Sequence, residues 1–286
     1  AGATTTLTRD MYYDSLTVNG GLATNGWRVF VKGTLSGTGN IAFESAPANG
    51  SNAVTSTDGA GAASTTGYFT STPGTTAGNG AICGTGSGTA GTAALYVPYA
   101  LLSSAGATGG AGSDPGCPTH DAGAAGATAG VATSTPLGVF PDLTFGGWDV
   151  SSTTPHTYNT YQVTSRATGG GGGVGGNGTG GVGGGGGGGA ESGGVVFIAA
   201  KTWAGTFQIQ ANGGNGGNGA AGQFGGDGTG GCGPGGNGGS AVVIYGTKTW
   251  SGAYNLTAGS NGTGAGSCGT PAAGTYFEIP VANFLR

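Results

Sequence analysis

The chain has 286 residues, of which 73 are glycine, 7 are lysine or arginine and 11 are aspartate or glutamate, and its formal net charge is −4 at pH 7. Disordered chains combine high net charge with low hydrophobicity, whereas 36% of these residues are hydrophobic, so the composition indicates an ordered protein. The weakly acidic balance argues against nucleic acid as a partner, and the absence of any run of 18 apolar residues argues against membrane insertion.

The N-terminal region, residues 1–45, has the pattern of a short β unit. Val29-Phe30-Val31 leads into Gly33-Thr34-Leu35-Ser36-Gly37 and then into Asn40-Ile41. Apolar runs separated by a glycine-containing turn are typical of neighbouring strands. We therefore interpret residues 1–45 as an N-terminal β unit and a candidate attachment region.

Residues 46–165 differ in composition, because alanine, serine, threonine and glycine dominate. This composition favours loops. Within the region, residues 93–102 predict a strand pair interrupted by Pro98, and residues 137–163 predict another strand-bearing unit. A weak three-residue glycine period runs through residues 104–130. We expect loops with interspersed strands.

The C-terminal region, residues 166–286, contains an internal repeat of about 47 residues. Its first copy is Val195-Val196-Phe197-Ile198, Lys201-Thr202-Trp203-Ala204-Gly205 and Phe207-Gln208-Ile209, and its second copy is Val242-Val243-Ile244-Tyr245, Lys248-Thr249-Trp250-Ser251-Gly252 and Tyr254-Asn255-Leu256. In the N-terminal unit, Leu35 and Gly37 take the places of Trp203 and Gly205. Repetition at this period predicts stacked strand units that share a continuous core.

The pattern within each copy predicts how its strands are buried. The apolar runs at 195–198 and 242–245 do not alternate, so they predict strands buried on both faces. Residues 206–211 alternate between polar and apolar side chains, which predicts a strand with one wet face.

Two glycine tracts precede these copies. Residues 169–189 hold 17 glycines in 21 positions and residues 213–239 hold 16 in 27, and in each tract a series of glycines recurs at every third position. This period is typical of the threefold polyglycine II helix, whose outward N–H and C=O groups can pair between neighbouring helices. At about 3.1 Å per residue, the first tract would span roughly 65 Å, which predicts a long, thin body.

These observations together predict an all-β fold. Its stacked strand units, arranged like a β-sandwich or a β-solenoid, alternate with packed polyglycine II helices. No stretch has the periodicity of an amphipathic helix, so we expect essentially no α-helix.

The four cysteines lie in glycine-rich loops, and none is part of a CxxC motif, which argues against a zinc site. Four cysteines allow three pairings, and free buried thiols are the alternative. We favour Cys83–Cys117 and Cys232–Cys268, because each pair joins tracts adjacent in sequence. Such cross-links fit an oxidising, extracellular setting.

Few residues offer catalytic or metal-binding chemistry. His120 and His156 have no partner at metal-ligand spacing, and Asp227 lacks the recurrence of calcium-binding repeats, so no metal or other cofactor is predicted. The GxGxxG matches lack the strand, helix and downstream acid of a nucleotide site. Trp203 and Trp250 could stack on sugars, but their matched places in the repeat favour a role in the core.

The opening of the chain carries a resemblance to a known class of proteins. Residues 7–18 (LTRDMYYDSLTV) continue through Asn25-Gly26-Trp27-Arg28-Val29-Phe30-Val31 to Leu35, and strand units then alternate with GGxGGxG tracts. This organisation resembles glycine-rich bacteriophage virion proteins, in particular tail-tip adhesins and fibres with packed polyglycine II helices. In those adhesins the glycine helices form a compact distal domain, whereas tract and strand are mixed here.

The resemblance implies a non-enzymatic virion surface protein, at a tail tip, in a fibre or as capsid decoration, that contacts the host envelope. It implies other virion proteins and a host surface glycan or outer-envelope protein as partners, and multi-copy assembly with a homotrimer as first guess. The loops that join the tracts would contact the receptor, including the Cys83–Cys117 region, His120, Phe224 and Asp227.

Two alternatives remain open. One is a cellular extracellular protein: an adhesin, a matrix filament subunit or a polyglycine-type ice-binding protein, for which residues 104–130 offer part of a Thr/Ala-rich face. The other, more remote, is a polysaccharide depolymerase, although no motif indicates a catalytic pair of carboxylates among the 11 acids.

Overall fold

Two parallel β-sheets form one end of the molecule in the computed structural model, which describes residues 3–63, 71, 73–80, 109–110, 112, 182–225 and 227–281. The short-strand sheet has the order β1 (Thr4–Thr6), β4 (Gly21–Ala23), β6 (Asn40–Ala42), β8 (Gln208–Gln210) and β10 (Tyr254–Asn255). The long-strand sheet has the order β11 (Thr275–Pro280), β9 (Ser240–Lys248), β7 (Val195–Trp203), β5 (Val29–Gly37) and β2 (Met11–Tyr13), and β3 (Leu16–Val18) also pairs with β5. Every strand pair is parallel.

The described part of the chain is all-β, as the sequence predicts, and it contains no helix. None of its elements is therefore a helix long and apolar enough to cross a membrane. The first glycine tract is described only from residue 182 onward, and the units predicted at 93–102 and 137–163 lie outside the described residues.

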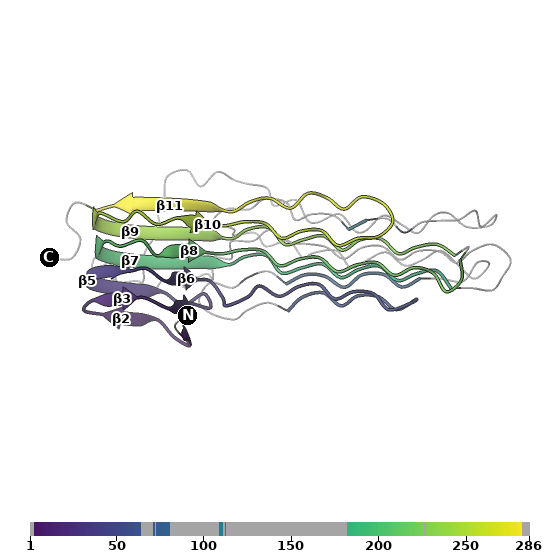
Figure 1. The fold of residues 1–286 in the computed structure, drawn as a ribbon, viewed down its shortest axis with the longest axis horizontal. Helices are drawn as coiled ribbons and strands as arrows, with labels where there is room; N and C mark the ends of the chain where they lie inside the picture. The colour runs from purple at the N-terminus through teal and green to yellow at the C-terminus, as the bar shows by residue number, and fades with distance from the viewer. Residues whose placement is uncertain are drawn as a thin grey trace, which may run out of the picture.

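From β5 onward the chain alternates between the two sheets, and its two kinds of connection differ in length. Connections from the long-strand sheet to the short-strand sheet are brief, such as residues 38–39 and 204–207. Connections in the other direction include residues 43–194, 211–239 and 256–274. Figure 1 shows the described parts of these long connections running side by side away from the strands, so the molecule is elongated.

The main core lies between the two sheets. It contains side chains from both of them, including Leu22, Ile41 and Ile209 of the short-strand sheet and Ile198 and Val243 of the long-strand sheet. Burial of apolar side chains is the dominant favourable contribution to the free energy of folding.

The opposite face of the long-strand sheet is also buried. Phe197 and Val242 belong to a second cluster, in which Phe277 and Ile279 are partly buried. Successive side chains of a strand point to opposite faces, so residues 195–198 and 242–244 are buried on both sides. This confirms the prediction made from the two non-alternating apolar runs, apart from the half-buried Tyr245 at the end of the second run.

The strand with one wet face is also confirmed. Phe207, Ile209 and Ala211 are buried, whereas Thr206 and Gln208 are exposed. The alternation in sequence therefore marks which side of β8 faces the core.

The N-terminal unit and the repeat copies share both sheets. β5 pairs with β7 and β6 pairs with β8, and Leu35 lies opposite Trp203, whose place it takes in the sequence. The strands also extend beyond the apolar runs. β7 continues to Trp203, into the segment that corresponds to the glycine-containing turn predicted for the N-terminal unit. This segment is part of the strand because Thr202 pairs with both Thr34 and Thr247.

The pairing offset differs from the sequence offset. The two repeat copies match at 47 residues, whereas β7 pairs with β9 and β8 with β10 at 45 residues, as in Val196↔Ala241 and Ile209↔Tyr254. A shift of two residues keeps every side chain on its own face of the sheet, so both offsets satisfy the same hydrophobic pattern. The structure adopts the smaller offset.

The glycine-rich segments are held together by backbone hydrogen bonds that recur at every third residue. Gly213, Gly216 and Gly219 donate to the carbonyl groups of residues 257, 260 and 263, over 2.8–2.9 Å. The next positions along the same segment, Gly214, Gly217 and Ala220, donate to residues 191, 188 and 185. One segment therefore bonds different neighbours with different sets of residues.

The central segment of this bundle is the run Gly183–Gly189, all of which is buried. Gly187 donates to Gly231, Gly188 to Ser51 and Gly189 to Thr75, so three consecutive N–H groups bond three different segments. A Cβ at Gly188 would lie 2.0 Å from the Ala60 carbonyl oxygen. Only a residue without a side chain fits at this position.

Replacing Gly188 by alanine is therefore expected to destabilise the protein. A Cβ added at this position must displace backbone, and overpacking of this kind typically costs about 1–3 kcal/mol. Gly225→Ala is the matched control, because no atom lies within 4 Å of a Cβ at that position. Thermal unfolding followed by circular dichroism should show a lower Tm for Gly188→Ala and an unchanged Tm for Gly225→Ala. Equal Tm values for the two variants would contradict the close packing.

Candidate functional site

The turn at residues 223–227, here called the distal turn, joins the two limbs of the 211–239 connection, far from the strands (Figure 1). Asp227 fixes its shape: its carboxylate accepts a hydrogen bond from the Phe224 N–H at 2.8 Å, and its own N–H donates to the Phe224 carbonyl at 2.9 Å. The limbs on either side are bonded to each other, as in Gly230 to Ala220. The turn therefore lies at the end of two segments whose backbones are hydrogen-bonded to each other.

Phe224 is the exposed apolar side chain of the distal turn, with 53% of its surface accessible. An aromatic ring on a fixed turn offers a large contact area at low conformational cost, which is the property of residues that anchor interfaces. The structure thus brings two of the predicted receptor-contact residues, Phe224 and Asp227, into one turn. The third, His120, lies outside the described residues.

One of the two predicted disulfides is present. Cys232 and Cys268 are bonded and link the 211–239 connection to the 256–274 connection. Cys83 and Cys117 lie outside the described residues, so their pairing remains a prediction.

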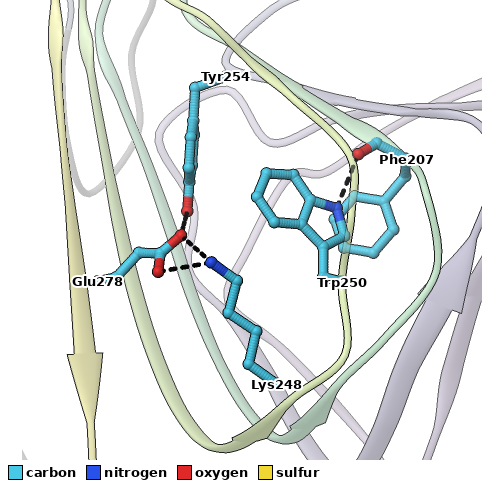
Figure 2. Close-up of polar contacts among 5 residues, drawn as sticks. All are labelled: Phe207, Lys248, Trp250, Tyr254 and Glu278. Carbon is cyan, nitrogen blue, oxygen red and sulfur yellow. Dashed lines mark hydrogen bonds and ion pairs between the residues drawn. The ribbon is translucent and has the colours of Figure 1, made fainter.

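The two repeat tryptophans lie in the core. Trp203 is fully buried, Trp250 is 8% exposed, and their rings meet edge to face at 5.3 Å between centroids. Trp250 Nε1 donates to the Phe207 carbonyl at 2.8 Å (Figure 2), whereas Trp203 Nε1 has no hydrogen-bond partner among the residues that the structure describes. Neither indole presents a platform to a sugar.

Three glycines occupy matched positions in the repeat: Gly37, Gly205 and Gly252. At each of them, another part of the backbone comes very close. Gly37 and Gly205 have φ values of +129° and +92°, a backbone conformation that side chains disfavour. At Gly252, a Cβ would lie 1.9 Å from the Phe207 carbonyl oxygen. Their recurrence in the sequence therefore has a structural cause.

A polar cluster that the sequence did not indicate joins the last three strands. Glu278 of β11 accepts hydrogen bonds from the Tyr254 hydroxyl at 2.8 Å and from Lys248 Nζ at 2.6 and 2.7 Å (Figure 2). The Lys248 ammonium also lies 5.3 Å from the centroid of the Trp250 ring. Burial, followed by the hydrogen bond to Glu278 and its negative charge, raises the pKa of Tyr254 above the ordinary tyrosine value.

A buried carboxylate ties distant parts of the 43–194 connection together at the base of the glycine bundle. Glu191 is 1% exposed and accepts hydrogen bonds from the Ala48 N–H, at 2.9 Å, and from the Ser71 hydroxyl. Buried charges require such partners. This contact joins residues that are 143 and 120 positions apart, and no local pattern in the sequence indicates it.

Comparisons with protein-family models, with curated protein sequences and with solved structures find no match. The described residues contain no group of three or more His, Cys, Asp or Glu side chains that could hold a metal ion.

The raised pKa of Tyr254 predicts a loss of stability at alkaline pH. Because the folded-state pKa lies above the unfolded value near 10, the stabilisation is complete below about pH 10 and is lost as the pH rises further. Tyr254→Phe removes this titrating group and should flatten the decline. Tm values measured from pH 8 to pH 11.5 should fall more steeply for the wild type than for Tyr254→Phe, and parallel curves would contradict the shift.

Proposed function

We propose that this chain is a non-enzymatic bacteriophage virion surface protein that contacts the host envelope through the distal turn. The observation that carries the proposal is the placement of an exposed Phe224, held by Asp227, at the end of long paired segments that run away from the strands. The resemblance of the N-terminal residues to phage virion proteins supports the same class.

The proposal includes the architecture of the two parts. The glycine-rich segments are polyglycine II helices packed side by side, and the strand pairs are stacked units of a β-solenoid. Hydrogen bonds at every third residue support the first statement, since the polyglycine II helix has three residues per turn. Chain alternation between two parallel sheets supports the second.

The proposed partners follow from the character of the exposed surface. An aromatic residue on a turn that lacks basic side chains suits a host surface glycan or an outer-envelope protein rather than nucleic acid. Other virion proteins would hold the strand end, in several copies, with a homotrimer as the simplest assembly. The Cys232–Cys268 disulfide supports an extracellular place.

A polyglycine-type ice-binding protein is the second candidate. It is favoured by the exposed hydroxyl groups of Thr257, Ser260 and Thr263, which recur at every third residue along one segment. Thermal hysteresis of the purified protein separates the candidates, because only the ice-binding protein depresses the freezing point below the melting point.

Mass spectrometry of purified phage particles tests the virion assignment directly. Peptides of this chain at a fixed ratio to other structural proteins are the expected result. Their absence from particles, together with secretion by a cell, would contradict the proposal and favour the cellular candidates.

Phe224→Ala is expected to weaken binding of the purified protein to host envelope extracts by tenfold or more, as for a central aromatic anchor. Tyr12→Ala is the control, because Tyr12 is an aromatic residue that is more exposed than Phe224, at 69%, and lies at the strand end of the molecule. Pull-down from envelope extracts measures both variants. Equal loss in both, or in neither, would exclude the distal turn as the contact.

A further inference from the structure

Three neighbouring glycine-rich segments form one exposed layer of the bundle. The segment at residues 212–220 bonds residues 48–53 and residues 257–263 as parallel neighbours. It also bonds residues 185–191 and residues 230–236, and each of these bonds the neighbour next to it. These four neighbours pack against the segment, and its exposed residues are Asn215 and Asn218.

The solvent side of this layer carries a regular set of polar side chains, here called the polar face. It consists of six exposed residues, two from each segment: Asn49, Asn52, Asn215, Asn218, Ser260 and Thr263. Members of one segment are three residues apart, or about 9 Å at the rise of a threefold extended helix. The face therefore repeats along the segments and across them.

Backbone groups fix the orientation of the asparagines. Asn49 Oδ1 accepts the N–H of Asn215 at 2.7 Å, and Asn52 Oδ1 accepts that of Asn218 at 2.8 Å. Asn215 Oδ1 in turn accepts the Ser260 N–H at 2.9 Å.

The same pattern recurs three residues along, where Asn218 Oδ1 accepts the Thr263 N–H at 2.8 Å. Each carboxamide oxygen is thereby used, and the amide NH2 groups of these four asparagines have no partner among the described residues. The result is a set of aligned hydrogen-bond donors whose rotamers are set before any ligand arrives, which reduces the entropy cost of binding.

The chemistry of the polar face limits its partner. Its six residues include no charged side chain, so polyanions, anionic lipid and nucleic acid gain no electrostatic attraction. They also include no aromatic or large aliphatic side chain, the usual anchors of a protein interface. Amide donors and hydroxyl groups in a repeating array match a polymer that presents neutral hydroxyl and ether oxygens at a regular spacing.

We propose that the polar face binds a neutral polysaccharide, with the sugar chain lying along the layer and its oxygens accepting hydrogen bonds from the asparagine amides. This inference rests on the proposed function for the setting in which the protein meets a glycan. The distal turn and the polar face are then two separate contacts, one terminal and one lateral.

The test uses substitutions that preserve the fold. Asn215→Asp with Asn218→Asp keeps the oxygens that accept the Ser260 and Thr263 N–H groups but replaces the outward NH2 donors by acceptors. Asn19→Asp with Gln208→Glu is the matched control, because it makes the same change at two exposed amides outside both the polar face and the distal turn. Circular dichroism and Tm establish that both double variants are folded.

The probes are dextran, mannan and amylopectin, with alginate as the anionic comparison, each cast into native gels for affinity electrophoresis. The wild-type protein and the control are expected to be retarded by at least one neutral polysaccharide and not by alginate. The Asn215→Asp, Asn218→Asp variant should bind that polysaccharide at least tenfold more weakly, through the loss of two donors.

Three results would overturn the proposal. These are no retardation of the wild type by any neutral polysaccharide, equal retardation of wild type and the Asn215→Asp, Asn218→Asp variant, and thermal hysteresis without retardation, which would assign the face to ice. Retardation that Phe224→Ala abolishes and the asparagine variant leaves unchanged would place the glycan at the distal turn. Detection of the chain in phage particles is independent of these results, so the proposed function can stand if the polar face fails.

Discussion

Backbone hydrogen bonding between segments without side chains is the constraint on which this structure depends. In an ordinary domain, apolar side chains fill the interior and the backbone bonds within sheets or helices. In the glycine bundle the backbone itself fills the interior, and Gly183–Gly189 occupies its centre, bonded to several neighbouring segments. Buried peptide groups must be paired, and these segments are paired to one another. A Cβ at Gly184 or Gly187 would lie within about 2 Å of a neighbouring carbonyl oxygen, so these positions tolerate only glycine.

The β-sheets supply the burial of apolar side chains that the glycine segments lack. Ordering glycine costs more conformational entropy than ordering any other residue, and a glycine segment contributes no apolar side chain to offset that cost. The side chains of the two-sheet core, which include Trp203 and Trp250, provide that burial. The strands also align the beginnings of the long connections, because β8 and β10 are adjacent and in register where the segments from residues 211 and 256 begin. The Cys232–Cys268 disulfide and the buried Glu191 add cross-links within the bundle.

The sequence predicted those features that depend on a local period. Alternation in residues 206–211 identified the wet face of β8, the apolar runs identified strands buried on both faces, and the repeat identified Leu35 as the counterpart of Trp203. Features set by register or by long-range contacts were not predictable. The offset of 45 residues satisfies the same pattern as the offset of 47, and the Tyr254–Glu278–Lys248 cluster requires three strands to be placed first. At the distal turn, Phe224 and Asp227 were predicted as contact residues, whereas the hydrogen bond between them was not. At the polar face, the sequence contains Asn-Gly-Gly triplets at residues 212–217, but which of their positions faces solvent depends on the neighbouring segments.

Hydrogen exchange of the amides in Gly183–Gly189 tests the central claim most directly, because these N–H groups have neither a helix nor a sheet to protect them. If inter-segment hydrogen bonds hold the interior, these amides exchange as slowly as those of β7 and β9 and far more slowly than those of the distal turn. Exchange of Gly183–Gly189 at the rate of an unstructured glycine peptide, with β7 and β9 still protected, would show that the strands fold without an ordered glycine interior and would contradict the claim.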